Sequence, residues 1–302
     1  MKDLLKMADL SQAELFEILD LAEKLKTERK NGIEHPILKG QSLGMIFQKS
    51  STRTRVSFET GMYQLGGQAL FLSPRDLQIG RGEPIQDTAR VLSRYLDGIM
   101  IRTYAQEEVE QLAKYASIPV INGLTDYCHP CQVLADLLTI REYKGGFDGL
   151  KMCFIGDGNN MANSLIVGGI KMGMSVSIGC PDNYRPDAAI MEWAAKSGDF
   201  TCTSDIFAAA EGADAVYTDV WASMGQEDEA KERAKAFAGY QVNSELMKVT
   251  NSGCMVLHCL PAHRGEEITD EVFEQHANEI FDEAENRLHA QKAVMVKLME
   301  NR

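Results

Sequence analysis

Apolar residues recur along this chain in two alternating patterns: short runs typical of buried strands, and spacings of three and four typical of helices. In the first half, apolar runs predict strands at residues 42–47, 69–72, 98–101 and 118–121. Between these runs, helices are expected at residues 54–65, 86–96 and 107–115. The alternation favours a parallel sheet with helices on both faces.

A long predicted helix at residues 130–143 ends at Gly145 and Gly146, and the alternation then starts again. Strands are expected at residues 151–155, 175–178, 215–218 and 255–259. Helices are expected at residues 160–172, 187–196, 205–210, 226–238 and 284–298. We therefore predict an α/β protein of two doubly wound parallel-sheet domains joined by helices, residues 1–146 and 147–302.

Length and charge narrow the class of protein. A chain of 302 residues is long for a single core, which agrees with two domains. Its 44 acidic residues outnumber 31 basic ones, and the formal charge of −13 argues against binding nucleic acid or an anionic membrane surface. No apolar run approaches the roughly 20 residues of a membrane span, and no signal-peptide core begins the chain. With seven cysteines, an odd number, we expect a cytoplasmic protein with reduced thiols.

The first candidate site is Ser51-Thr52-Arg53-Thr54-Arg55, which follows an expected strand and opens an expected helix. The amino end of a helix offers unpaired N–H groups and a partial positive charge. Arginine adds forked donors that match phosphate oxygens, so the motif favours a phosphate site. A plain N-cap with two solvated arginines is the alternative that the sequence leaves open.

Two more polar positions stand at expected strand ends in the first domain. Arg102 ends an apolar run, where a surface charge is the simpler interpretation. His129 and Gln132 belong to Cys128-His129-Pro130-Cys131-Gln132, which opens a helix. The Cys-x-x-Cys spacing could indicate redox chemistry or half a zinc site, but no second such pair follows. A histidine and an amide one turn apart fit a small-molecule site better.

The second domain opens with a glycine-rich turn, Gly156-Asp157-Gly158-Asn159-Asn160-Met161. Such a turn begins a dinucleotide site, and Asp182 stands where a ribose-binding acid would lie. An NAD-dependent dehydrogenase is therefore an alternative interpretation. Met161 replaces the third glycine, however, and two asparagines at a helix start suit an amino-acid ligand.

Two later strand ends add further candidates. Asp219 opens Asp-Val-Trp-Ala-Ser-Met-Gly, where it could bind or deprotonate a cationic amine. Cys259 lies in His258-Cys259-Leu260-Pro261 at the end of the last strand. The simpler interpretations are an aspartate N-cap beside a buried tryptophan, and an inert structural thiol.

In this order and at these intervals, Ser-Thr-Arg-Thr-Arg, His-Pro-Cys-Gln, Asp-x-x-x-Ser-Met-Gly and His-Cys-Leu-Pro resemble the ornithine carbamoyltransferases of the aspartate/ornithine transcarbamylase superfamily. The resemblance covers nearly the whole chain. It implies a first domain for carbamoyl phosphate, a second for L-ornithine, and a C-terminal helix that returns to the first domain. It also implies a homotrimer, or a multiple of trimers, with active sites at subunit interfaces, and no metal or organic cofactor.

The resemblance also assigns roles to individual residues. The expected carbamoyl-phosphate ligands are Ser51, Thr52, Arg53, Thr54, Gln78, Arg102, His129, Gln132, Cys259, Leu260 and Arg287, with Gln78 donated by a neighbouring subunit. The expected ornithine ligands are Asn160, Asp219, Ser223 and Met224. The expected catalytic residues are Arg102, His129, Asp219 and Cys259.

The implied reaction is attack of the ornithine side-chain amine on carbamoyl phosphate, giving L-citrulline and phosphate, with a role in arginine biosynthesis expected. A free alkyl amine has a pKa near ~10.4, so the site must remove a proton first. We expect Asp219 to orient the amine and Cys259 to assist proton removal. The alternatives are a transcarbamylase for another amine, such as putrescine or acetylornithine, and a non-catalytic ligand-binding paralogue.

Overall fold

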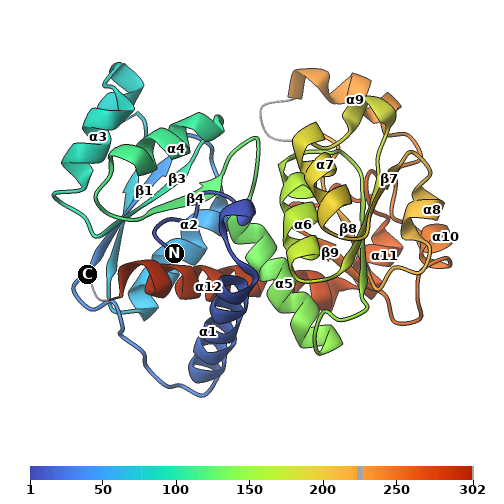
Figure 1. Cartoon of the computed structure of the whole chain (residues 1–302), viewed down its shortest axis with the longest axis horizontal. Coiled ribbons are helices and arrows are strands. Elements are labelled where there is room, and N and C mark those ends of the chain that lie inside the picture. Colours follow the sequence, from blue (N-terminus) through green and yellow to red (C-terminus); the bar gives the residue numbers. More distant parts are fainter. Residues whose placement is uncertain (76, 223–226, 301–302) are drawn as a thin grey trace. The chain divides into compact units, whose positions relative to one another are not determined.

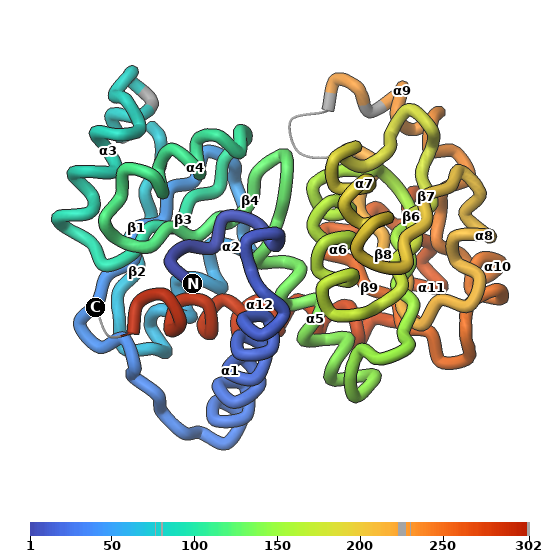
Figure 2. The backbone as a smooth tube through the Cα atoms, in the orientation of Figure 1, coloured from blue at the N-terminus to red at the C-terminus, as the bar shows by residue number. Residues whose placement is uncertain are grey.

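The computed structural model describes residues 1–75, 77–222 and 227–300. The chain divides into two compact units (Figures 1 and 2). Unit 1 comprises residues 1–138 and the segment from residue 286 onward, and unit 2 comprises residues 139–285. The chain passes between the units within two helices, α5 (Pro130–Lys144) and α12 (Ala277–Met299).

The proposed domain limits, residues 1–146 and 147–302, differ from this division at both helices. They assign all of α5 to the first domain and all of α12 to the second, whereas the units divide inside each helix. The physical reason is that a continuous helix can serve two cores without any glycine, proline or polar break to mark the change.

A four-stranded parallel sheet forms the centre of unit 1, in the order β2-β1-β3-β4. Its strands are β1 (Ser42–Phe47), β2 (Gln68–Leu72), β3 (Gly98–Arg102) and β4 (Val120–Leu124). The helices wholly within unit 1 are η1 (Met7–Asp9), α1 (Gln12–Lys30), α2 (Thr52–Gln64), η2 (Gln78–Arg81), α3 (Ile85–Leu92) and α4 (Gln106–Tyr115). The predicted alternation of strands and helices is confirmed.

Helices cover both faces of the unit 1 sheet. Ile99 and Ile101 of β3 share a buried cluster with Ala89 of α3 and residues of α4. Because residues alternate between the two faces of a sheet, Gly98 lies on the face opposite to that of Ile99 and Ile101. A Cβ atom there would lie 3.1 Å from the sulfur of Met299 in α12. The expectation that the C-terminal helix returns to the first domain is therefore confirmed.

Unit 2 contains a five-stranded parallel sheet in the order β7-β6-β5-β8-β9. Its strands are β5 (Lys151–Ile155), β6 (Ser175–Gly179), β7 (Phe200–Thr203), β8 (Ala215–Thr218) and β9 (Met255–His258). Its helices are α6 (Asn160–Lys171), η3 (Asp182–Tyr184), α7 (Ala188–Ser197), α8 (Ile206–Ala210), η4 (Glu227–Glu229), α9 (Ala230–Ala236), α10 (Ser244–Met247) and α11 (Asp270–Gln275). The two doubly wound sheets of the predicted fold are present.

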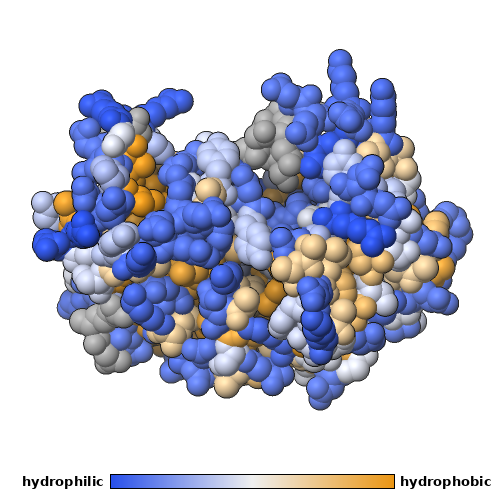
Figure 3. Space-filling view, turned by 45° about the horizontal axis from the view of Figure 1, so that its top comes forward, coloured by the Kyte–Doolittle hydropathy of each residue, from blue (hydrophilic) through white to orange (hydrophobic). Residues whose placement is uncertain are grey.

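Packing in unit 2 follows the same plan. Cys153 and Ile155 of β5 point into a cluster with α8, α10 and α11. On the other face α6 approaches so closely that a Cβ on Gly169 would lie 2.6 Å from Val176. Hydrophilic side chains predominate on the face drawn in Figure 3, as 25% charged residues lead one to expect.

Each sheet has one point at which the strand order reverses, and several candidate residues lie next to these two points. In unit 1 the reversal lies between β1 and β3, where Phe47 pairs with Arg102. In unit 2 it lies between β5 and β8, where Ile155 pairs with Thr218. Open α/β sheets bind ligands beyond the carboxyl ends of such strands. The segments that follow these strands begin at Gln48 and Thr103 in unit 1, and at Gly156 and Asp219 in unit 2.

A lysine is buried in the core of unit 1. Lys292 of α12 is fully buried, and its Nζ donates to Oε1 of Gln64 at 3.0 Å. Burial and the neighbouring charge of Arg29, opposed by Glu28, together lower the pKa of Lys292 to about 8. At pH 7 the folded protein therefore holds a charged amine in an unfavourable place. Lys292→Met should raise the free energy of unfolding at pH 7 by about 1–3 kcal/mol.

The pH dependence gives this prediction a distinct signature. The folded chain loses the Lys292 proton at a lower pH than the unfolded chain, so wild-type stability should rise between about pH 8 and 10.5. Urea unfolding of Lys292→Met should lack that rise, whereas Lys297→Met, on an exposed part of the same helix, should retain it. A destabilised Lys292→Met protein at pH 7 would contradict the prediction.

Candidate active site

The first part of the site is the amino end of α2. Ser51 caps the helix, because its side chain accepts a hydrogen bond of 3.2 Å from the backbone N–H of Thr54. Thr54 is buried, Arg53 is half-buried and Thr52 is exposed. Ser51 and Thr52 also line an open cavity of about 640 Å³. The plain N-cap that the sequence left open is present, and the helix end remains suited to an anion.

The positive charges of three arginines lower the pKa of one buried histidine in unit 1. His129, directly before α5, is 5% exposed, and Arg102, at the end of β3, is 8% exposed. Burial holds the pKa of His129 well below 6.5, and the positive charges of Arg287, Arg102 and Arg53 lower it further. The imidazole is therefore uncharged at neutral pH. Concentrated positive charge in a chain of net charge −13 is the local condition that an anionic substrate needs.

Arg287 ties three helices together at this place. Its Nη1 donates to Oε1 of Gln132 in α5 at 2.6 Å, and its Nη2 donates to Oγ1 of Thr54 in α2 at 3.1 Å. Gln132 in turn donates through Nε2 to Oδ1 of Asp136 at 2.9 Å. Hydrogen bonds and electrostatic interactions thus link six of the predicted residues: Arg53, Thr54, Arg102, His129, Gln132 and Arg287. The bonds of Arg287 hold Thr54 and Gln132 in place within this group.

The remaining unit 1 positions behave differently. Gln78 lies on η2, and its side chain is exposed. Cys128 and Cys131, which frame His129, are both buried, and burial raises the pKa of each to about 12. Neither thiol is a thiolate at neutral pH, so the redox interpretation of the Cys-x-x-Cys spacing is not supported.

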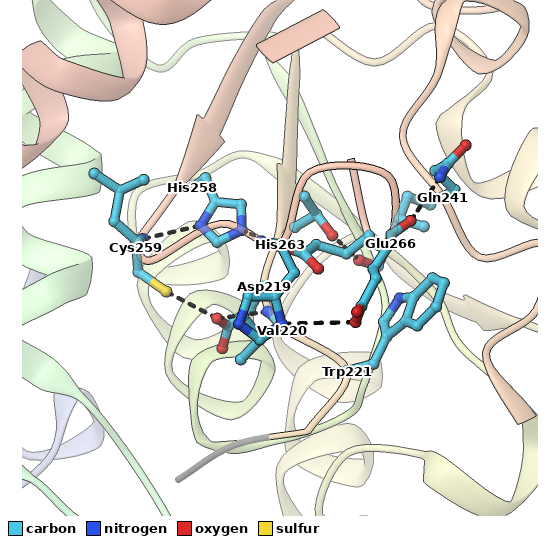
Figure 4. A network of polar contacts seen from close by, with 12 residues as sticks. Asp219, Val220, Trp221, Gln241, His258, Cys259, His263 and Glu266 are labelled. Carbon is cyan, nitrogen blue, oxygen red and sulfur yellow. Dashed lines mark hydrogen bonds and ion pairs between the residues drawn. The ribbon is translucent and has the colours of Figure 1, made fainter. Parts of the chain in front are cut away.

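The centre of the unit 2 site is Asp219, which follows β8 and is buried (Figure 4). Its Oδ1 accepts hydrogen bonds from the backbone N–H of Val220 at 2.8 Å and from the Cys259 thiol at 3.0 Å. Its Oδ2 accepts from the side-chain amide of Asn159 at 2.9 Å. Two predicted residues, Asp219 and Cys259, are therefore in direct contact. Because an ionised carboxylate has about four acceptor sites, Asp219 keeps capacity for one more donor.

A buried network beneath Cys259 fixes the backbone on either side of it (Figure 4). The backbone N–H of Leu260 donates to Nδ1 of His258 at 2.9 Å, so Nδ1 is the acceptor nitrogen of the ring. The ring proton is then on Nε2, which donates to Glu267 at 2.9 Å. The N–H of His258 donates to Glu283 at 2.8 Å. Leu260 has a φ of +57°, a left-handed conformation that costs a leucine about 1–3 kcal/mol. The His258 bond offsets that cost.

An ion pair that the sequence analysis did not single out holds the glycine-rich turn. Arg233 of α9 is buried, and its Nη1 donates to Oδ2 of Asp157 at 3.0 Å and to the carbonyl of Trp221 at 3.1 Å. Burial raises the pKa of Asp157 to about 7; Arg233 opposes this shift, and the charges of Asp219 and Glu229 add to it. No pattern marked Arg233, since it lies 76 residues from Asp157 in a charged stretch.

The glycine-rich turn is filled by the chain itself. A Cβ on Gly158 would lie 2.2 Å from the backbone nitrogen of Pro186, and the Gly158 N–H donates to the Tyr184 carbonyl at 2.8 Å. Asn159 caps α6 by accepting from the N–H groups of Met161 and Ala162. A pyrophosphate needs these same N–H groups, so the dinucleotide alternative is disfavoured.

Two predicted ornithine ligands, Ser223 and Met224, lie outside the described residues. Asn160 is the first residue of α6 and is half-buried, directly after the asparagine that bonds Asp219. Within the adjacent pair, Asn159 donates to the Asp219 carboxylate, a role that the sequence pattern did not assign to it.

Asp219, His258 and Cys259 bring possible metal-ligand atoms within 4.8 Å of one another. Both ring nitrogens of His258 are already engaged, one with Leu260 and one with Glu267. A metal ion there would have to displace one of these buried bonds, so the donor set fits the hydrogen-bond network better than a metal.

Two family models match the chain. The model described as "Aspartate/ornithine carbamoyltransferase, carbamoyl-P binding domain" matches residues 2–142. The model described as "Aspartate/ornithine carbamoyltransferase, Asp/Orn binding domain" matches residues 148–298. Together they cover nearly all of the sequence.

Ornithine carbamoyltransferases are among the relatives that match nearly the whole chain. The ornithine carbamoyltransferase of Syntrophotalea carbinolica is 57% identical over 299 residues, which cover 99% of each chain. That of Oceanobacillus iheyensis is 56% identical over 312 residues, covering 99% of this chain and 94% of the relative.

Solved structures agree with the sequence relatives. The ornithine carbamoyltransferase of Pyrococcus furiosus has a TM-score of 0.95 at 52% identity and covers 100% of this chain and 98% of its own. The anabolic ornithine carbamoyltransferase of Campylobacter jejuni has a TM-score of 0.94 at 42% identity, with 100% of both chains covered.

Proposed function

The chain belongs to the aspartate/ornithine carbamoyltransferase family, and on that premise we propose that it transfers the carbamoyl group of carbamoyl phosphate to the side-chain amine of L-ornithine. The products are L-citrulline and phosphate. The observation that carries the proposal is the convergence of three guanidinium groups on the uncharged His129. A ureido-product assay with both substrates should detect citrulline, and an inactive folded protein would overturn the proposal.

We assign carbamoyl phosphate to the unit 1 residues. The amino end of α2 and Arg53 suit the phosphate, since helix N–H groups and guanidinium forks both bind its oxygens. Thr54, Arg102 and His129 suit the carbonyl oxygen, which becomes negative as the amine attacks. An uncharged His129 can donate one N–H there without adding a fourth positive charge.

We assign the amine to Asp219 and Cys259 in unit 2. Asp219 supplies the buried negative charge that draws in an ammonium group and orients it. Because a lone carboxylate would keep the amine protonated, proton removal needs a second group. The Cys259 thiol already donates to Asp219, so it can accept the amine proton while passing its own to the carboxylate. Ser223, Met224 and Asn160 complete the proposed ornithine site.

Arg233 is expected to control ornithine binding from a distance. It bonds Asp157, three residues before Asn160, and Trp221, two residues after Asp219, so it holds both segments that carry proposed ornithine ligands. Arg233→Gln should raise the KM for ornithine by about 10–100-fold, because a buried Asp157 would lose its partner. The KM for carbamoyl phosphate should change far less in the same steady-state assay.

Two variants make the Arg233 prediction specific. Lys235→Gln, on the exposed side of the same helix, should leave both KM values unchanged. Arg233→Lys should recover only part of the affinity, since lysine keeps the charge but loses the fork and the stacking on Tyr184. Equal losses for both substrates in Arg233→Gln would mean a general folding defect instead.

We propose a homotrimer, or a multiple of trimers, as the working assembly. Several large apolar side chains around the edge strand β2 are exposed: Val56, Tyr63, Leu70 and Phe71. An edge strand with an apolar surface is a natural place for another subunit. Gln78 is exposed as well, which suits a residue donated to a neighbour. Light scattering should give a multiple of three chains of 33.5 kDa.

No helix in the described ranges is both long and apolar enough to cross a membrane. We propose that the enzyme works in the cytoplasm and in the direction of arginine biosynthesis. The similarity to the anabolic ornithine carbamoyltransferase of Campylobacter jejuni supports this direction.

A further inference from the structure

Two thiols face each other at one side of the unit 2 sheet. Cys180 follows β6, and Cys202 lies in the neighbouring strand β7. Their sulfur atoms are 3.8 Å apart. The backbone N–H of Cys180 donates to the carbonyl of Thr203 at 3.0 Å, so the two chain segments are held side by side. Neither cysteine takes part in the proposed reaction.

The two thiols differ in access. All seven cysteines lie within the described residues, and only Cys202 and Cys259 are half-buried; the others, Cys180 among them, are buried. A dissolved oxidant can therefore reach Cys202, while Cys180 stands directly behind it. A reactive thiol next to a second, protected thiol is the arrangement from which a disulfide forms readily.

The charges around the pair favour reaction at Cys202. The contact with Cys180, in which either thiol can donate, and the positive charge of Arg185 lower the pKa of Cys202, while burial opposes this shift. Asp182, which is bonded to Arg185, raises it slightly. The same contact, together with burial, raises the pKa of Cys180. Because Cys202 is the more accessible of the two thiols and the nearby Arg185 charge favours its thiolate, we assign Cys202 as the attacking group and Cys180 as the thiol that resolves it.

We propose that Cys180 and Cys202 form an oxidation-sensitive site that closes into a reversible disulfide when the protein meets a peroxide. The Cys202 thiolate attacks one peroxide oxygen, the O–O bond breaks, and hydroxide leaves with a sulfenic acid on Cys202. The Cys180 thiol then attacks that sulfur, and water leaves. The two thiols lose two electrons and two protons in all, and the peroxide is reduced to two waters.

Closure of the disulfide also affects the proposed amine site. The sulfur atoms must approach from 3.8 Å to about 2.05 Å, and we expect this contraction to draw the end of β6 toward β7. Pro181–Tyr184 follows at once, and the Tyr184 carbonyl holds the Gly158 N–H at 2.8 Å. Gly158 is packed directly against the backbone of Pro186, so a shift of residues 181–186 would displace it. If the proposed function holds, oxidation should therefore raise the KM for ornithine, by about 3–10-fold, more than the KM for carbamoyl phosphate.

The crosslink itself is tested without any activity measurement. The reduced full-length protein is treated with hydrogen peroxide, free thiols are alkylated, and proteolytic peptides are identified by mass spectrometry. We expect one peptide pair joined through Cys180 and Cys202, two hydrogens lighter than the free peptides and reopened by dithiothreitol. Cys153 and Cys254, a buried pair in one core cluster, should stay alkylatable only after unfolding. Oxidation of Cys202 to a sulfinic acid without the crosslink would overturn the proposal.

The coupling to the amine site needs a matched variant. Cys202→Ser lacks the attacking thiol but keeps Cys259, so peroxide damage at Cys259 would affect both proteins alike. A rise in the ornithine KM that occurs in the wild type and is absent in Cys202→Ser supports the coupling. The same rise in both proteins would overturn it. If the reduced wild type forms no citrulline at all, the proposed function fails, while the crosslink result stands independently.

Discussion

Arg102→Met is expected to lower kcat by about 10²–10³ while the protein remains folded. Arg102 ends β3 at the point of strand reversal, is 8% exposed, and places its charge next to His129. Negative charge on the carbonyl oxygen develops only as the amine attacks, so removing this donor should weaken the transition state more than the bound substrate. Methionine keeps the length of the side chain and avoids a large cavity.

A second readout separates this role from a structural one. The Arg102 charge contributes to the low pKa of His129, so Arg102→Met should raise that pKa toward 6.5, although burial and Arg287 still lower it. NMR titration of the imidazole measures this shift. Arg90→Met, which removes an exposed guanidinium paired with Asp87, should change neither kcat nor the histidine. A kcat for Arg102→Met near the wild-type value would remove Arg102 from the proposed mechanism.

Asp219→Asn is expected to lower kcat/KM for ornithine by about 10²–10³. The carboxylate accepts from Val220, Cys259 and Asn159 with both of its oxygens. An asparagine has a single acceptor oxygen, so its NH₂ group must face at least one of these donors. The negative charge that draws in the ammonium group is lost as well. The KM for carbamoyl phosphate should change much less, because that substrate is assigned to unit 1.

Asp205→Asn is the matched control in unit 2. Asp205 caps α8 by accepting from the N–H groups of Phe207 and Ala208, and asparagine caps helices equally well. This variant should keep both the stability and the kinetics of the wild type. If Asp219→Asn behaved like Asp205→Asn, the amine would not be bound where we place it.

The sequence predicted the buried strands well because their patterns are simple. The expected limits of the strands at Ser42–Phe47, Lys151–Ile155 and Ala215–Thr218 match the structure. These strands lie in the interior of their sheets, so they are continuous apolar runs with polar residues after them. The strand Phe200–Thr203 was missed because it lies at the edge of its sheet and is only partly buried. Short helices such as Ser244–Met247 carry too few residues for a periodic signal.

The helix at the end of the chain shows why some contacts stay hidden. It was expected at residues 284–298 and spans Ala277–Met299. The acidic residues in its first turns are typical of a solvent-exposed surface. Glu283 is nevertheless buried and accepts hydrogen bonds from the Tyr217 hydroxyl and from the backbone N–H of His258. Only the folded chain shows that this carboxylate has partners.

Short motifs at or near strand ends single out four candidates from the sequence alone: Arg102, His129, Asp219 and Cys259. Residues that act through others carry no such motif. Arg233 donates to Asp157, which lies 76 residues earlier in the chain. Glu267 is hydrogen-bonded to His258, although its sequence neighbours are charged residues typical of a surface. Such pairs arise from the topology of the sheet, which a local pattern does not record.

Ornithine is the amine that we propose this enzyme carbamoylates. The most direct test measures ureido-product formation from carbamoyl phosphate with ornithine, putrescine, acetylornithine, lysine and aspartate at equal concentration. We predict that kcat/KM for ornithine exceeds that for every other amine by at least about 10²-fold, because an amine without the α-amino and α-carboxylate groups of ornithine leaves their partners in the site unpaired. A higher kcat/KM for putrescine or acetylornithine would contradict the claim.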